Sequence, residues 1–231
     1  MSRILYDLTG ANDLRFSPNC WRSRMALAHK GLDVECEPCR FTEKDKIAFS
    51  GQTRVPILRD GERVVTDSWN IACYLEEAYP DGPSLFGDGI GYGVTRHLNA
   101  WVNTVLHPAV VKTFLVDIHD SLDPEDQAYF RETREKRFGV PLEQVSQDRQ
   151  DNLAALRHAL APTNDALEAQ DWICGEAPAY GDYLVFGTFQ WARAVSPVHV
   201  AEPGTPLHAW NERMLDLYDG LGRKVVPAKT A

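Results

Sequence analysis

Residues 54–72 read RVPILRDGERVVTDSWNIA, and this stretch decides the fold of the first third of the chain. Two short apolar runs flank Asp60-Gly61, and an Asp-Gly pair between apolar runs is typical of a β-hairpin. A helix is expected to begin at Ser68 and to end before Pro80. The apolar face of this helix comprises Ile71, Leu75 and Ala78. The stretch therefore predicts two antiparallel strands followed by a helix.

The residues before this stretch predict a strand, a helix and a second strand. Residues 4–8 form an apolar-rich run, and Ser17-Pro18 is typical of a helix start, with serine as N-cap and proline as the first helical residue. Gly31 is placed to end that helix, and residues 32–38 resemble a second strand. Two strands joined by a helix form a right-handed parallel unit by default. The order β-α-β and then β-β-α is that of a thioredoxin-like domain.

The second part of the chain has a different pattern. Residues 80–92 are rich in proline and glycine and are expected to form a linker. Beyond them, apolar residues recur at three and four positions, which predicts helices that are kinked or ended at Pro108 and Pro162. The expected fold class is therefore α/β plus all-α, with a thioredoxin-like domain over 1–79 and an all-helical domain over 93–231.

The composition excludes several classes of partner. The 231 residues include 24 Lys and Arg against 33 Asp and Glu, which gives a net charge of −9. Nucleic acids and anionic membranes are bound through clustered positive charge, and the sequence has no Lys/Arg-rich run, so neither is expected as a partner. Asp7 and Asp13 disfavour a signal peptide, and no apolar run approaches the ~18 residues of a membrane span. The five cysteines lack disulfide spacing, so a cytoplasmic location is expected.

The stretch Ser17-Pro18-Asn19-Cys20 stands where the first helix begins. In a thioredoxin-like domain this place faces a cleft, and the free N–H groups of a helix N-terminus favour a thiolate or another anion. Taken alone, the serine is a plain helix cap. Because serine occupies the first, nucleophilic position of a Cys-x-x-Cys pattern, two-cysteine disulfide exchange is not available here. Cys20 is expected to be a half-buried helix residue.

Two further motifs could contribute binding groups to this cleft. A cis bond between Val55 and Pro56 would turn the Val55 backbone toward the cleft, where it can pair with an extended peptide. Asp67-Ser68 stands at the start of the next helix, where the hydroxyl and free N–H groups suit a carboxylate and the Asp67 side chain suits an ammonium group. Taken alone, the first motif is a trans proline at a strand start and the second is a capping sequence.

Together and in this order, Ser17, Val55-Pro56 and Asp67-Ser68 resemble the motifs of the cytosolic glutathione S-transferase superfamily. The resemblance covers the whole chain. Within the superfamily, the sequence is most similar to the serine-type bacterial β-etherases and fungal-type glutathione transferases. The stretches that carry this likeness are 17–22, 54–56, 67–72 and the carboxyl-terminal LYDGLGR of 217–223.

The resemblance implies how glutathione, the cosubstrate, is bound. Ser17 is expected near the sulfur as the catalytic residue. Val55, beside the cis-proline Pro56, is expected to pair with the cysteinyl backbone, and Asp67 and Ser68 to hold the γ-glutamyl end. The candidates for the glycyl carboxylate are Arg54, Gln52, Lys44 and Lys46. A homodimer and a hydrophobic, aromatic electrophile are also implied, with β-aryl ether cleavage as the reaction of the subgroup.

Other assignments are open from the sequence. Tyr6, Asn12, Asn19 or backbone N–H groups are alternatives to Ser17 for stabilising the thiolate. A glutathione-dependent reductase is a second class of enzyme, although a cysteine is then expected where Ser17 stands. A non-catalytic, transferase-like binding or scaffold protein is a third class, and such proteins tend to lose the glutathione contacts that this sequence keeps.

The remaining cysteines, histidines and aromatic residues have simpler interpretations. Cys36-x-x-Cys39 has no nearby histidine or second cysteine pair, so no metal is expected. Surface or core positions are expected for His97, His107, His119 and His158. Most aromatic residues of the helical domain are expected in its core, and any that face the cleft would suit a planar apolar substrate. These aromatic residues are Trp101, Phe114, Tyr129, Tyr183, Phe186, Phe189, Trp191 and Trp210.

Residues 175–182, GEAPAYGD, match the superfamily's buried helix-capping motif with one departure. The usual Ser, Thr or Asn cap is Ala179 here, while Asp182 can still bond back to the helix start. The missing acceptor is expected to cost about 1 kcal/mol.

Overall fold

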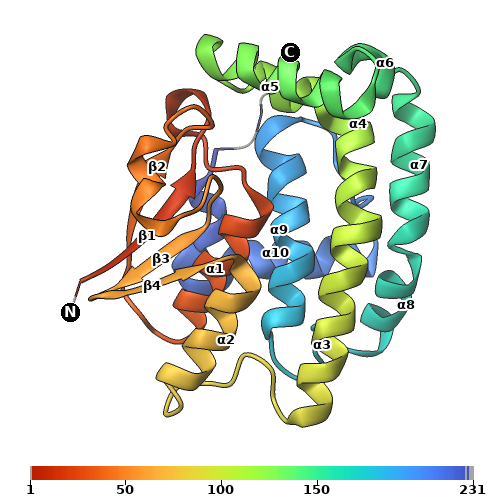
Figure 1. Cartoon of the computed structure of the whole chain (residues 1–231). Helices are drawn as coiled ribbons and strands as arrows, with labels where there is room; N and C mark the ends of the chain where they lie inside the picture. The colour runs from red at the N-terminus through yellow and green to blue at the C-terminus, as the bar shows by residue number, and fades with distance from the viewer. Residues whose placement is uncertain (1, 227, 229–231) are drawn as a thin grey trace.

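The computed structural model describes residues 2–226 and 228, which form two parts (Figure 1). The first part is a four-stranded sheet with two helices. Its elements are β1 (Arg3–Leu8), η1 (Ala11–Asp13), α1 (Pro18–His29), β2 (Glu35–Cys39), η2 (Asp45–Ser50), β3 (Ile57–Asp60), β4 (Arg63–Thr66) and α2 (Ser68–Ala78). Apart from the short 3-10 turns η1 and η2, this is the β-α-β and β-β-α order predicted from the sequence.

The strands lie in the order β2-β1-β3-β4. β1 and β2 are parallel, whereas β3 is antiparallel to both β1 and β4. The hairpin is confirmed, but Asp60 still pairs with Arg63, so the turn residues are Gly61 and Glu62. Gly61 has a φ of 58°, a left-handed conformation that glycine adopts without steric cost. The fold of this part is thioredoxin-like, as expected, with β2 starting at Glu35, later than the expected run of 32–38.

The second part of the chain is helical. Its elements are α3 (Gly89–Trp101), η3 (Val102–Leu106), α4 (His107–Asp120), α5 (Pro124–Phe138), α6 (Leu142–Val145), α7 (Arg149–Ala159), α8 (Ala161–Ala169), α9 (Tyr180–Val195), α10 (Pro206–Gly220) and η4 (Leu221–Lys224). Within the part of the chain that the structure describes, the β-type pairing here is limited to one isolated bridge between Trp172 and Gly175. The all-helical prediction is therefore confirmed.

The connection between the two parts is shorter than the expected 80–92. α3 already begins at Gly89 because the Asp88 carboxylate caps it, with Oδ1 accepting a hydrogen bond from the Gly91 N–H at 2.9 Å. Pro108 and Pro162 lie in the first turns of α4 and α8, where a missing N–H costs least. The segment before Pro108 is the π-helical turn η3, so α3, η3 and α4 follow one another without a loop.

The two parts share one hydrophobic core. α1 lies between the sheet and α9, and α9 packs closely against α1 (Figure 1). Trp21 of α1 meets Phe186 of α9 edge to face, with ring centroids 6.2 Å apart. The approach requires Gly187, because a Cβ there would lie 2.4 Å from the carbonyl oxygen of Pro18. This contact fixes the beginning of α1 against the helical domain.

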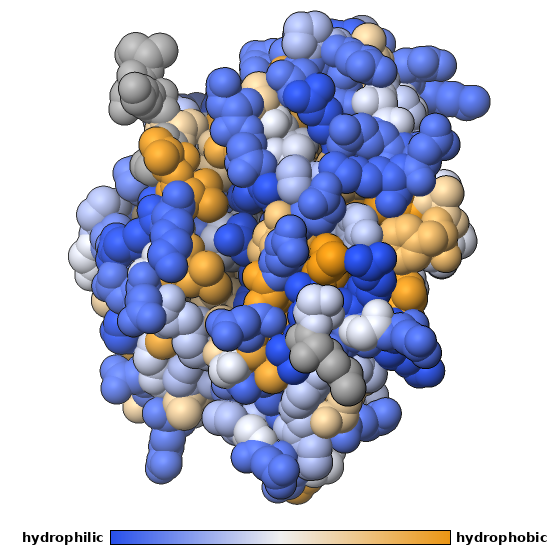
Figure 2. All heavy atoms as spheres, turned by 90° about the vertical axis from the view of Figure 1, so that its left-hand side faces the viewer, coloured by the Kyte–Doolittle hydropathy of each residue, from blue (hydrophilic) through white to orange (hydrophobic). Residues whose placement is uncertain are grey.

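The surface agrees with the polar composition. Figure 2 shows that the face carrying the sheet is mainly hydrophilic, with apolar side chains in separate groups. Across residues 2–226 and 228, no helix has both the length and the apolar composition needed to cross a membrane.

Candidate functional site

Ser17 is the N-cap of α1, as predicted. Its Oγ accepts a hydrogen bond from the backbone N–H of Cys20 at 3.4 Å. The residue lines two cavities, one of about 470 Å³ toward η2 and Val55 and one of about 140 Å³ toward α4 and α5. The hydroxyl and the free N–H groups at the start of α1 therefore face the space between the two domains.

Val55 lines the same 470 Å³ cavity as Ser17, and the Val55-Pro56 peptide bond is cis, as predicted. Pro56 is buried at the start of β3, and its carbonyl oxygen accepts a hydrogen bond from the Asp67 N–H at 3.3 Å. This bond ties the cis-proline turn to the start of α2. The three motifs of the sequence are thus brought to one region of the sheet domain.

α2 begins at Ser68, as predicted, and Asp67 is its N-cap. The Asp67 Oδ1 atom accepts hydrogen bonds from the N–H groups of Trp69 at 2.9 Å and Asn70 at 3.3 Å. Its φ of 73° places the residue in the left-handed region, which aspartate tolerates better than most residues. Asp67 and Ser68 line a polar cavity of about 600 Å³. Asn19 lines this cavity and also the one beside Ser17 and Val55, so the two cavities adjoin.

The structure distinguishes among the four side chains that are candidates for binding the glycyl carboxylate. Lys44 and Arg54 line the cavity beside Val55, and the Lys44 Nζ donates to the Thr53 carbonyl oxygen at 2.9 Å. Lys46 instead pairs with Glu37 at 2.7 Å, and Gln52 is outside the residues that line the cavity. Arg54 and Lys44 therefore remain as candidates.

The structure also distinguishes among the side chains that are alternatives to Ser17 for stabilising the thiolate. Tyr6 is buried in β1, packs against Phe49 with ring centroids 5.1 Å apart, and is not among the lining residues. Asn12 lies in η1 and lines neither cavity, whereas Asn19 lines one of the two. Of these three side chains, Asn19 alone shares a cavity with Ser17.

Sequence reasoning missed a buried arginine beside Asp67. Arg22 of α1 is 1% exposed and lines the polar cavity. Its guanidinium donates to Asn103 Oδ1 at 3.1 Å, to Asn99 Oδ1 at 3.4 Å and to His107 Nε2 at 3.1 Å. No carboxylate of the described residues forms a salt bridge with it, and burial lowers the pKa of Arg22 to about 10. The partners lie about eighty residues further along the chain, so no local signal could have found them.

His107 is a half-buried acceptor in this network. Burial and the adjacent Arg22 charge lower the pKa of His107 to about 3. Since a guanidinium only donates hydrogen bonds, a neutral His107 presents a lone pair to it. The sequence places His107 at the surface or in the core, and the structure places it at the contact between the domains.

The other side of the Ser17 cleft is apolar. The 140 Å³ cavity is lined by residues of α4, α5 and α9, including Ile118, Phe130 and Trp191. Of the aromatic residues expected in the helical domain, Tyr129 and Trp191 line cavities beside Ser17, whereas Phe114, Tyr183, Phe186 and Trp210 are buried in the core. Phe16 and Phe41 also line the apolar cavity, although they lie outside the helical domain, where the sequence predicted the aromatic lining.

Cys20 is more deeply buried than expected, with 0% exposure. Its Sγ accepts a hydrogen bond from the Leu8 N–H at 3.5 Å, and burial raises the pKa of the thiol. A thiol that is buried and protonated is a poor nucleophile. Over residues 2–226 and 228, no group of three or more His, Cys, Asp or Glu side chains has the arrangement of a metal site.

The capping motif before α9 is built as expected. Asp182 Oδ2 accepts from the Ala179 N–H at 3.1 Å, and the other contacts of this carboxylate are with the N–H groups of Ile173, Cys174 and the Trp210 indole. Ala179 has no side-chain acceptor for the helix start. The motif orders the segment that leads into α9 and lies outside the cleft.

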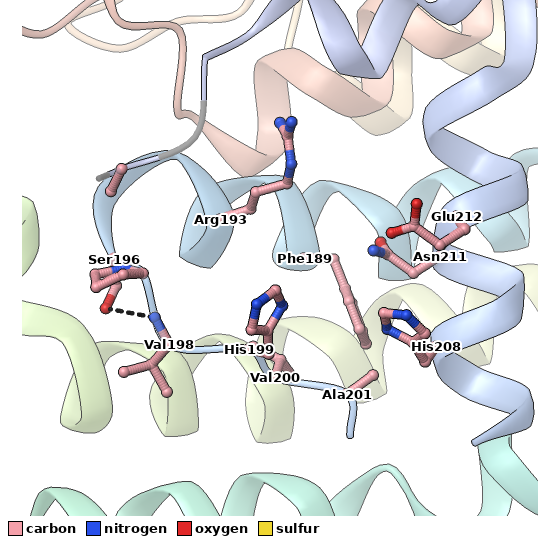
Figure 3. Close-up of a pocket in the computed structure, with 12 residues that line it drawn as sticks. Phe189, Arg193, Ser196, Val198, His199, Val200, Ala201, His208, Asn211 and Glu212 are labelled. Atoms are coloured by element: carbon pink, nitrogen blue, oxygen red, sulfur yellow. Dashed lines mark hydrogen bonds between the residues drawn. The ribbon is translucent and has the colours of Figure 1, made fainter. Parts of the chain in front are cut away.

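A separate cavity of about 230 Å³ lies in the helical domain between α9, α10 and the segment 196–201 (Figure 3). It shares no described lining residue with the Ser17 cleft. Arg193 lines it, but its guanidinium donates to the carbonyl oxygens of Gly222 at 3.4 Å and Val225 at 2.9 Å. This arginine therefore holds the carboxyl-terminal segment in place.

The fold and the cleft define a class of two-domain proteins. In this class, a thioredoxin-like domain offers a helix start beside a cis-proline, and a helical domain covers the same cleft. Residues 13–84 match the family model for the glutathione S-transferase N-terminal domain, and residues 94–216 match that for the glutathione S-transferase C-terminal domain. The chain belongs to the glutathione S-transferase family.

Curated relatives agree with this assignment. The glutathione S-transferase-like protein ustS of Aspergillus flavus is 27% identical over 140 residues, which cover 54% of this chain and 49% of the relative. A zeta-class glutathione S-transferase of Euphorbia esula is 30% identical over 118 residues, which cover 48% of this chain and 52% of the relative. The chain spans about half the length of the curated relatives it matches.

Solved structures share the fold along nearly the whole chain. The glutathione transferase GSTFuA2 of Phanerochaete chrysosporium has a TM-score of 0.77 and 25% identity, with 97% of this chain and 95% of that chain covered. CsGST63524 of Ceriporiopsis subvermispora, solved with glutathione, has a TM-score of 0.81 and 22% identity, with 100% of both chains covered. The β-etherase LigF of Sphingobium sp. strain SYK-6 has a TM-score of 0.68 and 21% identity, with 97% of this chain and 99% of that chain covered.

Proposed function

We propose that the protein is a glutathione transferase in which Ser17 stabilises the glutathione thiolate for attack on a hydrophobic, aromatic electrophile. One observation carries the proposal. Ser17, at the start of α1, shares a cavity with Val55, and that cavity adjoins the one lined by Asp67 and Ser68. The arrangement offers an anion site, a backbone for an extended peptide and a carboxylate for an ammonium group, in the order that a tripeptide with a central thiol requires.

The roles of the individual residues follow from this order. The thiol lies at Ser17, and the cysteinyl backbone pairs with Val55 beside Pro56. The ammonium group of the γ-glutamyl end meets Asp67, and its carboxylate meets Ser68 and the free N–H groups of α2. Arg22, which forms no salt bridge among the described residues, lies in the same polar cavity and favours that carboxylate further. Arg54 or Lys44 takes the glycyl carboxylate.

The chemistry needs a thiolate at neutral pH. A free glutathione thiol has a pKa near ~8.5, so only a few per cent is ionised at pH 7. Lowering this pKa by ~2 units requires the site to favour the thiolate by roughly 2.7 kcal/mol. One hydroxyl hydrogen bond and the N-terminus of α1 supply free energy of that order. Ser17 then donates a hydrogen bond and is not itself a nucleophile.

The thiolate forms a bond to an electrophilic carbon, and the leaving group departs with the bonding electrons. In a β-aryl ether the carbon–oxygen bond breaks, and the aryloxide leaves and takes up a proton. The apolar cavity lined by Ile118, Phe130 and Trp191 supports an aromatic acceptor. The fold shared with the β-etherase LigF is compatible with ether cleavage as the particular reaction.

Two other functions are less well supported. A disulfide reductase needs a reactive cysteine at the start of α1, and Cys20 is buried behind Ser17. A scaffold protein has no need for the polar cavity with Asp67 and Arg22, which costs free energy when it holds no anion.

Calorimetry with millimolar glutathione tests binding, and turnover is tested with 1-chloro-2,4-dinitrobenzene and a β-aryl ether. We expect heat of binding and release of chloride or aryl alcohol. If glutathione binds but no substrate is turned over, the scaffold protein is favoured. If glutathione gives neither heat of binding nor thermal stabilisation of the protein, glutathione is not the ligand. Turnover of chlorinated aromatics alone would leave a transferase without etherase activity.

We further propose a homodimer, because α3 presents an exposed apolar stripe. Its most exposed apolar members are Ile90 and Val94, with Val105 further along in η3. The spacing of these residues places them along one side of the helical run. Light scattering at micromolar concentration is expected to give twice the chain mass of 26.0 kDa. A mass of one chain would contradict the dimer, and Val94→Glu is expected to weaken it.

A further inference from the structure

We propose that the acceptor substrate carries an acidic oxygen group, such as a ring carboxylate, and that Arg134 and Arg137 of α5 bind it. The inference rests on the proposed function, since it names the substrate class of the same cleft. Both arginines line the cavity beside Ser17 and also the apolar cavity beside Trp191.

The cleft is positively charged in a chain whose net charge is −9. Five cationic side chains line the 470 Å³ cavity: Arg40, Lys44, Arg54, Arg134 and Arg137. Among the described residues that line this cavity or the apolar one, none is Asp or Glu. An acidic protein that gathers cations around one cleft, with no carboxylate among the described residues that line that cleft, attracts anionic ligands to it.

The five cations divide into two groups by position. Lys44 and Arg54 line the cavity on the side of Val55, where the glycyl carboxylate of glutathione is proposed. Arg40 is engaged with Asp123 at 3.0 Å. The two arginines of α5 differ from these three because they also line the apolar cavity. They are therefore available to the second substrate.

Arg134 is held in place by aromatic rings but lacks a counter-ion. Its guanidinium lies 4.4 Å from the centroid of the Phe130 ring and 5.3 Å from that of Phe41. Its Nη1 donates to Thr133 Oγ1 at 2.9 Å. Within residues 2–226 and 228, neither Arg134 nor Arg137 forms a salt bridge with a carboxylate.

The environment of Arg134 favours an added negative charge. Burial lowers the pKa of Arg134, and the neighbouring charges of Arg137 and Arg54 lower it further. Both effects oppose the charged form, and an anion placed between the guanidinium groups relieves them. A planar guanidinium also binds a carboxylate through two parallel hydrogen bonds.

The two cavities fix the orientation of such a substrate. Ser17 and Arg134 line both, so a ring seated against Ile118 and Trp191 can reach the thiolate at one edge and the arginines at another. A neutral aromatic compound gains only the apolar contact. The proposal therefore predicts selectivity between two acceptors that differ by one acidic group.

The test compares 2-chloro-1,3-dinitrobenzene with 4-chloro-3,5-dinitrobenzoate, which has the same chlorine and nitro groups and an added carboxylate para to the chlorine. In both, the glutathione sulfur bonds to the ring carbon and chloride leaves, so the added carboxylate is the main difference. We expect the wild type to have a KM at least about tenfold lower for the benzoate. Arg134→Met and Arg137→Met should each raise that KM about tenfold and leave the KM of the neutral substrate and of glutathione within twofold.

Arg131→Met is the matched control. It removes a charge from the same helix, but Arg131 pairs with Glu135 and Glu143 and lines neither cavity. Its KM values should equal those of the wild type. If Arg134→Met fails to fold, the exposed Arg137 provides the readout. Equal KM values for both substrates, or equal losses for both in the arginine variants, would overturn the proposal.

A binding assay separates this proposal from the transferase activity. Without glutathione, 8-anilinonaphthalene-1-sulfonate and neutral N-phenyl-1-naphthylamine are titrated by fluorescence. Tighter binding of the sulfonate, lost in Arg134→Met but kept in Arg131→Met, supports the acid site even if no transfer is observed. If both dyes bind equally and none of the variants changes their binding, the acid site is overturned, whether or not the protein binds glutathione.

Discussion

The Oγ atom of Ser17 lies 3.4 Å from the backbone nitrogen of Cys20 and accepts its N–H hydrogen bond. A hydroxyl that accepts one bond still has its own proton to donate. Ser17 therefore serves two purposes: it caps α1, and it presents an O–H group to the cavity where a sulfur is proposed. The two purposes can be separated by mutation.

Ser17→Ala is expected to raise the pKa of the bound glutathione thiol by about one to two units, because the thiolate loses a hydrogen bond of ~1.5–3 kcal/mol. Turnover near neutral pH should fall roughly ten- to hundredfold. The thiolate absorbance of the complex, followed against pH, measures the shift. Ser17→Thr keeps the hydroxyl and should retain most of the activity. If the pKa of the bound glutathione thiol is unchanged in Ser17→Ala, Asn19 or the backbone N–H groups stabilise the thiolate instead.

Asp67→Asn tests the ammonium site without removing the cap of α2. Asparagine can still accept from Trp69 and Asn70 and tolerates the left-handed φ of 73°, but it carries no charge. The Kd for glutathione is expected to rise about tenfold or more, as for a lost charged hydrogen bond, with thermal stability nearly unchanged. Calorimetry measures the affinity. Unaltered affinity would show that the γ-glutamyl end lies elsewhere.

The Arg22–His107 contact predicts a loss of stability in mild acid. Because the pKa of His107 is lowered to about 3, the unfolded chain binds a proton below pH ~6.5 that the folded chain does not. Stability is therefore full well above that pH and falls as the pH decreases, by about 1.6 kcal/mol between pH 6.5 and 5. His107→Gln keeps an acceptor for Arg22 and should lose most of this dependence in urea unfolding at pH 7, 6 and 5. Parallel pH profiles for the two proteins would refute the assignment.

Ala179→Ser is expected to stabilise the protein by about 0.5–1 kcal/mol, because it supplies the acceptor that the start of α9 lacks. Asp182 already bonds back to the Ala179 N–H, so the serine would complete a reciprocal capping pair. Urea denaturation measures the gain, and Ala177→Ser, at an exposed position just before, is the control. A gain shared by both variants would be unrelated to the cap.

Local signals in the sequence determined most of the fold. The Asp60-Gly61 pair, the Ser17-Pro18 helix start and the change to helical spacing after residue 80 are consequences of backbone geometry within a few residues, so they predict elements correctly. The resemblance to the superfamily's motifs, and not a local signal, predicted the cis Val55-Pro56 bond and the cap formed by Asp182. One boundary differs from the prediction, since the Asp88 cap starts α3 inside the expected linker.

Only the tertiary structure decided which side chains share a cavity. Arg22 meets Asn103 and His107 across the domain contact, and Arg134 joins Ser17 from a helix more than a hundred residues away. Such contacts depend on how α9 packs against α1, and local sequence patterns do not record this packing. The buried charge of Arg22 and the cationic side of the cleft therefore became visible only when the helices were brought together, because burial and electrostatic interaction act through space.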